Sequence, residues 1–202
     1  MAAKKNDLER ALLRAQQSLN GRCRFALVGG LAVSVRAAAR TTKDVDLAIS
    51  VRDDKEAEQL LGNLQASGYQ VQTIVEQTAT ERLATARLRH SSEPMVFLDL
   101  LFSSSGIEPE IVEHAELMTV LSAHQLPVAT VGDLMAMKVL SRDDRKRPQD
   151  WDDLRNLAAI ATAADLSQAR TSIAAIEARG YQRNRDLLRL FEEILRDFER
   201  EA

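Results

Sequence analysis

Two aspartates separated by one residue, Asp44 and Asp46, are the residues of this sequence best placed to do chemistry. Residues i and i+2 of a strand point to the same face of a sheet. We therefore expect both carboxylates side by side at the exposed start of an apolar strand over residues 45–51. Paired carboxylate oxygens suit a Mg²⁺ ion that is bound to a nucleotide phosphate. The spacing predicts a metal site at these two aspartates.

A glycine pair, Gly29-Gly30, precedes the aspartates and lies between an apolar run and a helix-like segment. Backbone N–H groups at a helix N-terminus can bind a phosphate directly when no side chain stands in the way. Two acids separated by one residue are common on surface strands and usually have no function. The glycine turn ahead of them favours a nucleotide site over a solvated strand end.

Asp99 is the candidate for a third carboxylate, because it interrupts the apolar run over residues 95–102. An unpaired buried charge costs several kcal/mol, so this side chain needs a cation or hydrogen-bond donors. One interpretation is that Asp99 completes the metal cluster. The other is an aspartate at a strand end that is bonded to an arginine or to backbone N–H groups. We expect the first.

These motifs resemble those of the nucleotidyltransferase (DNA polymerase beta-like) superfamily, and within it the AbiEii/AbiGii toxin-type nucleotidyltransferases. The first matching pattern is a glycine pair followed by Arg-x-Thr-x-Asp-x-Asp-Leu, at Gly29, Gly30, Arg40, Thr42, Asp44, Asp46 and Leu47. The second is a helix with a lysine followed by an Asp-x-x-Asp-Leu run, at Lys138, Asp150, Asp153 and Leu154. The resemblance covers roughly residues 25–157. It implies an α/β (α+β) fold, a mixed-sheet core with flanking helices followed by a C-terminal helical region.

The resemblance also implies an activity, the Mg²⁺-dependent transfer of a nucleoside monophosphate from an NTP to an acceptor hydroxyl. The acceptor would be RNA, with tRNA 3′ ends as the suggestion, or a protein, and the enzyme would be the toxin that pairs with a cognate antitoxin. Two Mg²⁺ ions would be held by Asp44, Asp46 and Asp99. The implied nucleotide-binding residues are Gly29, Gly30, Arg40, Thr42 and Lys138, and the implied catalytic residues are the three aspartates, Lys138 and Asp150.

Three alternatives stay open at this point. Lys138 could be a solvated helix lysine, and Asp150 could act on the nucleotide, act on a metal or cap a helix. The acceptor could be a small molecule such as an aminoglycoside, for which acids are available at Glu108, Glu110, Glu113 and Glu116. The chain could also be a non-catalytic nucleotide-binding module.

Composition sets limits on these readings. The chain has 202 residues, of which 45% are hydrophobic and 28% charged, as in ordinary globular proteins. Its formal net charge of −3 excludes a globally basic nucleic-acid binder but leaves room for a local patch. A single cysteine, no signal-peptide pattern and no long apolar run lead us to expect a cytoplasmic protein with no membrane segment.

Hydrophobic periodicity and turn residues predict the surrounding elements. Strands or extended segments are expected at 24–28, 45–51, 69–75, 81–89, 95–102, 117–121 and 126–129. Helices are expected at 6–19, 31–39, 53–67, 110–115, 131–141, 148–162, 166–179 and 184–200. Asp165 and Gln168 are expected to form a capping pair for the seventh helix. We divide the chain into a nucleotidyltransferase-like core, residues 1–129, and a helical region, residues 130–202.

Overall fold

Seven strands form one mixed sheet in the computed structural model, which describes residues 2–38, 41–121, 124–143 and 149–201 of the chain. In their order across the sheet they are β3 (Tyr69–Glu76), β4 (Leu83–His90), β5 (Phe97–Leu101), β2 (Val45–Ser50), β1 (Arg24–Val28), β7 (His124–Val128) and β6 (Glu116–Val120). The predicted mixed α/β architecture is confirmed.

The centre of the sheet combines parallel and antiparallel pairs. Strand β2 runs parallel to β5 and antiparallel to β1, and β1 runs parallel to β7. Antiparallel hairpins, β3–β4 and β6–β7, form the two edges. A parallel pair needs a long crossover, and a helix and the β3–β4 hairpin supply it between β2 and β5. Residues far apart in the sequence therefore meet on neighbouring central strands.

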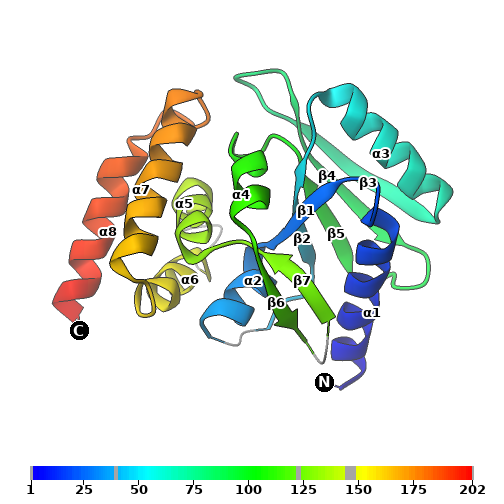
Figure 1. Ribbon diagram of the computed structural model, residues 1–202, viewed down its shortest axis with the longest axis horizontal. Helices are drawn as coiled ribbons and strands as arrows, with labels where there is room; N and C mark the ends of the chain where they lie inside the picture. Colours follow the sequence, from blue (N-terminus) through cyan, green and yellow to red (C-terminus); the bar gives the residue numbers. More distant parts are fainter. Residues whose placement is uncertain (1, 39–40, 122–123, 144–148, 202) are drawn as a thin grey trace.

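Helices surround the sheet and continue into a C-terminal group. They are α1 (Ala2–Leu19), α2 (Gly29–Arg36), α3 (Asp54–Ala66), α4 (Glu108–His114), α5 (Val131–Ser141), α6 (Gln149–Ala158), α7 (Ala163–Ala178) and α8 (Leu187–Glu201). In Figure 1, α7 and α8 lie at one end of the molecule, and α1 and α3 lie at the other. Helices α5 and α6 contact α2, so the helical group rests against the element that follows β1.

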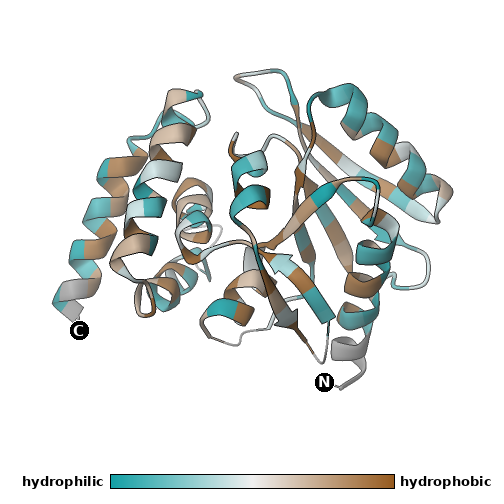
Figure 2. Cartoon of the chain, in the orientation of Figure 1, coloured by the Kyte–Doolittle hydropathy of each residue, from teal (hydrophilic) through white to brown (hydrophobic). Residues whose placement is uncertain are grey.

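The first helix buries the apolar stripe that its sequence predicts. Leu8, Leu12, Ala15 and Leu19 recur at helical spacing and are all buried against the sheet. The same alternation of hydrophilic and hydrophobic turns is visible along the outer helices α3 and α8 (Figure 2). Among the helices of the described residues, none is long and apolar enough to cross a membrane.

Helices α2 and α7 begin earlier than predicted. Helix α2 begins at Gly29, two residues before the predicted Leu31, so both glycines belong to its first turn. The predicted capping pair of Asp165 with Gln168 is wrong. In the structure Thr162 is the N-cap of α7: its hydroxyl accepts from the Asp165 N–H, and the Asp165 carboxylate accepts from the Thr162 N–H at 2.8 Å. This capping box fixes the start of α7 and ends the preceding turn.

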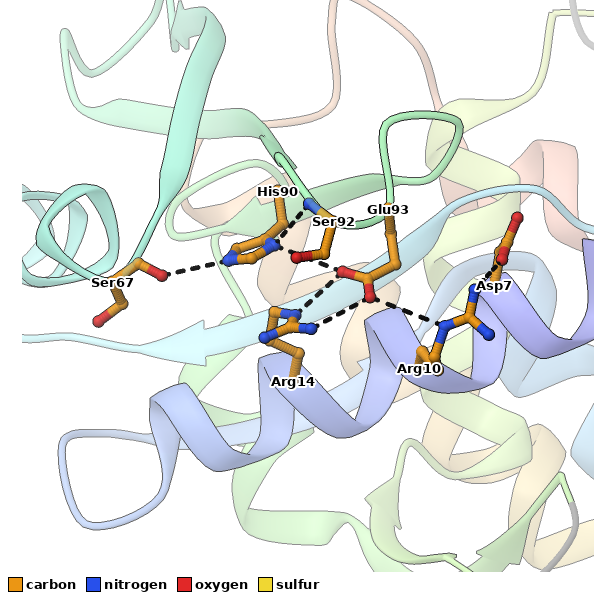
Figure 3. Close-up of polar contacts among 7 residues, drawn as sticks. All are labelled: Asp7, Arg10, Arg14, Ser67, His90, Ser92 and Glu93. Carbon is orange, nitrogen blue, oxygen red and sulfur yellow. Dashed lines mark hydrogen bonds and ion pairs between the residues drawn. The ribbon is translucent and has the colours of Figure 1, made fainter.

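A buried carboxylate ties α1 to the turn between β4 and β5 (Figure 3). The side chain of Glu93 is 2% exposed and accepts from Arg14 Nε at 2.9 Å and Nη2 at 3.2 Å, with Arg10 Nε at 3.9 Å. His90 Nδ1 accepts the Ser92 N–H, which leaves His90 Nε2 to donate to a backbone carbonyl before β3. This polar cluster holds the N-terminal helix against the sheet.

Candidate active site

The register of two central strands brings the carboxylates together. Asp46 on β2 lies directly opposite Asp99 on β5 in the parallel pairing, and on its other side it lies opposite Val28 at the end of β1. Asp44 comes immediately before β2 and is more exposed, with 37% of its side chain accessible. The three aspartates predicted from the sequence therefore gather at one end of neighbouring strands.

Gly29 makes room for Asp46. It adopts φ of +66°, a left-handed conformation that glycine accepts and other residues resist. A Cβ atom at this position would stand 2.1 Å from Asp46 Oδ2, which is far inside van der Waals contact. The interpretation from the sequence was that a glycine at this position lets a phosphate approach the backbone. The structure shows a second reason, which is the space that the Asp46 carboxylate occupies.

The Asp46 carboxyl lies in an electrostatically unfavourable position. Burial, together with the negative charges of Asp99 and Asp44, raises the pKa of Asp46 to about 7. Lys138 and Arg87 act in the opposite direction and do not compensate fully. A carboxyl at this place favours a nearby cation, because added positive charge stabilises its ionised form.

Arg87 is the site residue that the sequence reasoning did not place here. It lies opposite Asp99 in the antiparallel β4–β5 pairing. Its guanidinium donates two hydrogen bonds to that carboxylate, from Nε to Oδ1 at 2.8 Å and from Nη2 to Oδ2 at 2.6 Å. Its Nη2 is also 4.0 Å from Asp44 Oδ2. The hydrogen bonds to Asp99 raise the pKa of Arg87 further above its usual value. A signal existed in the sequence, since Arg87 alternates with apolar residues in the strand before Asp99.

Lys138 is held by two aspartates of the next helix. Its Nζ lies 2.7 Å from Asp150 Oδ1 and 2.6 Å from Asp153 Oδ2, and all three side chains are buried. The Ser141 hydroxyl donates to the other Asp150 oxygen at 2.9 Å. The interpretation of Lys138 as a solvated helix lysine is therefore wrong. The structure also gives Asp150 a definite partner, Lys138.

A cleft of about 530 Å³ collects most of the predicted residues. Lys43 also lines this cleft, and the hydroxyl of Thr42 donates to the Asp44 carbonyl at 3.4 Å. Arg40 lies outside the described residues, so its predicted role stays a prediction. The predicted residues that line the cleft are Gly29, Gly30, Thr42, Asp44, Asp46, Asp99, Lys138 and Asp150.

A second, larger cavity of about 880 Å³ adjoins this cleft. The β3–β4 hairpin forms one side of the cavity, and residues 180–184, between α7 and α8, form the other. The two spaces share five lining residues, Thr85, Arg87, Asp99, Ser104 and Arg183. Arg87 and Asp99 therefore stand at the boundary between the two spaces.

The three carboxylates have the chemistry that a divalent cation requires, but their positions in this structure do not form a metal site. Three carboxylates meet at one strand end, where burial and the neighbouring negative charges raise the pKa of Asp46. Within the described residues, no three Asp, Glu, His or Cys side chains are disposed to hold a metal together. In this arrangement the guanidinium of Arg87 is bonded to both oxygens of Asp99.

Other charged residues near the cleft have structural partners. Arg36 donates to the carbonyls of Val128 and Ala129, which links α2 to the end of β7. Glu108 accepts from three successive N–H groups of residues 104–106. The four glutamates considered for an acidic acceptor pocket, Glu108, Glu110, Glu113 and Glu116, are absent from the linings of both cavities.

A mixed sheet with an Asp-x-Asp strand beside a glycine turn, and a lysine helix closing the cleft, defines a nucleotidyltransferase. Residues 10–202 match the family model described as nucleotidyl transferase AbiEii toxin, type IV TA system. The chain therefore belongs to the AbiEii nucleotidyltransferase toxin family. No curated protein matches the sequence.

Solved structures share the fold at low sequence identity. The antibiotic-resistance factor ANT(2'')-Ia superposes with a TM-score of 0.55 and 14% identity, covering 88% of this chain and 93% of that chain. An antigenic nucleotidyltransferase-like protein from Paracoccidioides brasiliensis gives a TM-score of 0.50 and 19% identity, covering 95% of this chain and 91% of that chain. At such identities the likeness concerns the fold.

Proposed function

We propose that this protein is a Mg²⁺-dependent enzyme that joins an acceptor hydroxyl to the α-phosphorus of an NTP and releases pyrophosphate. The observation that carries the proposal is the pairing of Asp46 with Asp99 on neighbouring strands, directly over Gly29. Paired carboxylates beside a helix N-terminus suit a metal-bound triphosphate. The family membership of the chain supports the same reaction.

Asp44 and Asp46 would hold the cations, with Asp99 as the third ligand. A divalent cation bound there supplies charge neutralisation and makes the acceptor hydroxyl more acidic. Two ions are expected, as the resemblance implied. The contribution of the protein is the placement of its carboxylates, since strand register fixes Asp46 and Asp99 and the missing side chain of Gly29 leaves space for Asp46.

The phosphates would lie along the first turn of α2. Gly29 and Gly30 begin that helix and line the cleft together with Thr42 and Lys43. The Lys138 ammonium faces the same cleft, where it would offset charge that develops on the leaving pyrophosphate. Asp150 and Asp153 would keep Lys138 in position, which makes Asp150 a positioning residue.

The acceptor would be RNA, with tRNA 3′ ends first in line, or a protein hydroxyl. Membership of a toxin family from type IV toxin–antitoxin systems supports a macromolecular acceptor and a cognate antitoxin. The larger cavity offers room beside Asp99 for such an acceptor. The small-molecule alternative has less support, because the four glutamates it called for do not line either cavity.

The test is label transfer from each α-³²P-NTP, with Mg²⁺, into total RNA and total protein. Wild type is compared with Asp46→Asn, which keeps the size of the side chain and removes its charge. Asp152→Asn is the matched control, since Asp152 is exposed on α6 and lines neither cavity. We expect label with wild type and the control, and at least about a thousandfold less with Asp46→Asn.

The outcomes of the label-transfer experiment distinguish the candidate functions. Label in RNA or in protein names the acceptor class and the nucleotide. Full transfer by a folded Asp46→Asn variant would refute the assigned chemistry. Absence of label with wild type, while nucleotide binds in a Mg²⁺-dependent way, would favour a small-molecule acceptor or a non-catalytic binding module.

A further inference from the structure

The Arg87–Asp99 pair occupies a place that the proposed chemistry needs for a cation. Asp99 uses both carboxylate oxygens on the guanidinium, at 2.8 and 2.6 Å. A carboxylate engaged at both oxygens by an arginine has its negative charge largely compensated and one lone pair of each oxygen in use. A metal ion at Asp99 therefore has to compete with Arg87.

Strand register makes this pairing a built feature of the fold. Arg87 and Asp99 lie directly opposite each other on β4 and β5. Opposite charges at facing cross-strand positions stabilise the pairing of the two strands. The guanidinium also lies over the ring of Phe97, with its carbon 5.0 Å from the ring centroid. Phe97 is two residues before Asp99 on β5, so it shares the same face.

The exposure of the two side chains allows the Arg87–Asp99 ion pair to separate. The side chain of Arg87 is 42% exposed, whereas that of Asp99 is 11% exposed. Because Arg87 is the exposed partner, water can replace part of what its guanidinium loses when the two side chains separate. Arg87 lines both cavities, so a rotation away from Asp99 takes its head group into water and not into the protein interior.

We infer that Arg87 is a placeholder for the metal: it neutralises Asp99 in the nucleotide-free protein and competes with the divalent cation for that carboxylate. This inference rests on the proposed function of the site. On arrival of the cation, Arg87 leaves Asp99 and turns toward the larger cavity, which it already lines. Asp99 is then free to complete the carboxylate set.

Competition has a measurable signature that a purely structural role lacks. Removal of the guanidinium should strengthen cation binding, whereas the loss of a merely stabilising residue would leave it unchanged or weaken it. The experiment is Mn²⁺ binding to the nucleotide-free protein, followed by the electron paramagnetic resonance signal of free Mn²⁺. We expect Arg87→Gln to bind Mn²⁺ about two- to fivefold more tightly than wild type.

Two further variants separate competition from the general field of a positive charge. Arg89→Gln removes the same charge two residues farther along β4, at a residue that lines neither cavity, and should leave Mn²⁺ affinity within twofold of wild type. Arg87→Lys keeps the charge but not the two-armed grip, so its affinity should lie between those of wild type and Arg87→Gln. Circular dichroism spectra verify that each variant is folded.

The outcomes distinguish this inference from the proposed function. Mn²⁺ affinity that is equal or weaker in both Arg87 variants would overturn the placeholder role, and so would equal tightening in Arg87→Gln and Arg89→Gln. If Asp46→Asn bound Mn²⁺ as wild type does, the metal site of the proposed function would itself be wrong. Weakened binding in Asp46→Asn with unchanged binding in Arg87→Gln would reject the placeholder alone.

Discussion

Asp46 lies between Asp99 on the neighbouring strand and the bare backbone of Gly29, and its chemistry follows from that crowding. Burial and two adjacent carboxylates raise its pKa to about 7. An ionised Asp46 is therefore a cost to the metal-free fold. The same cost becomes an advantage for function, because a cation that relieves it binds more strongly.

The first prediction concerns pH. The folded-state pKa of Asp46, about 7, lies above the value of roughly 3.9 in an unfolded chain. Between these values the folded protein keeps a proton that the unfolded chain has released, so the free energy of unfolding falls as pH rises through that window. The Asp46→Asn variant has no carboxyl at this position and should not lose stability in this way as pH rises. In EDTA, we expect the thermal midpoint of Asp46→Asn to exceed that of wild type at pH 8 and the difference to shrink at pH 5.

Differential scanning calorimetry at the two pH values makes the measurement. Asp152→Asn serves as the control, because its exposed carboxyl should give the same small difference from wild type at both pH values. A difference between Asp46→Asn and wild type that did not change with pH would contradict the raised pKa.

At the residue scale, the sequence predicts the candidate metal ligands better than it predicts the residues that contact them. Asp44, Asp46 and Gly29 are local motifs, so their positions could be predicted directly. Asp99 could be recognised as a charge in an apolar strand, but its grip by Arg87 depends on the register of two strands. Nothing local in the sequence encodes that register, and for the same reason the contact of Lys138 with Asp150 came only from the structure.

At the scale of elements, helix α1 illustrates how a polar anchor works with an apolar stripe. Leu12 and Leu19 bury the helix against the sheet, and Glu93 fixes it through Arg14. The stripe could be predicted because its period is local. The anchor could not, since 79 residues separate Arg14 from Glu93. The choice between neighbouring capping residues is equally hard to predict from sequence, as Thr162 shows at the start of α7.

The second prediction tests that anchor. Glu93→Gln keeps the shape of the side chain but leaves Arg14 and Arg10 without their buried counter-charge. We expect the free energy of unfolding to fall by about 2 kcal/mol. Urea unfolding followed by circular dichroism gives the value.

Glu58→Gln is the matched control for this measurement. Glu58 is exposed on α3, and its substitution should change stability by less than about 0.5 kcal/mol. Equal effects of the two substitutions would mean that the Glu93 cluster contributes nothing beyond a surface charge.

At the scale of the whole molecule, the division into a core, residues 1–129, and a helical region that packs on it, residues 130–202, stays a prediction. One continuous cluster of buried apolar residues runs from Leu8 in α1 to Ile194 in α8. Leu134 and Lys138 of α5 line the same cleft as Asp46, so both parts of the chain form this cleft. We infer from the shared core that the chain folds as one unit.

The third prediction follows from this shared core. The chain carries two natural probes, Cys23 before β1 and Trp151 in α6, its only cysteine and only tryptophan. Burial raises the pKa of the Cys23 thiol to about 11, so the folded protein should react slowly with a thiol reagent at pH 8. We expect Cys23 reactivity and Trp151 fluorescence to report the same urea midpoint.

Coincident midpoints require that both parts unfold together. Far-ultraviolet circular dichroism provides a third probe that samples every helix and strand. Separate midpoints, with Trp151 changing before Cys23 reacts, would show that the helical region is an independent domain.

The contact between Gly29 and Asp46 has a genetic consequence. Every missense change in a glycine codon adds at least a Cβ atom, and at Gly29 that atom has no room beside the Asp46 carboxylate. One base change there displaces the Asp46 carboxylate, a proposed metal ligand, without touching any aspartate codon. In a toxin gene under selection to be silenced, inactivating alleles should therefore accumulate at codon 29 as readily as at the codons of the aspartates themselves.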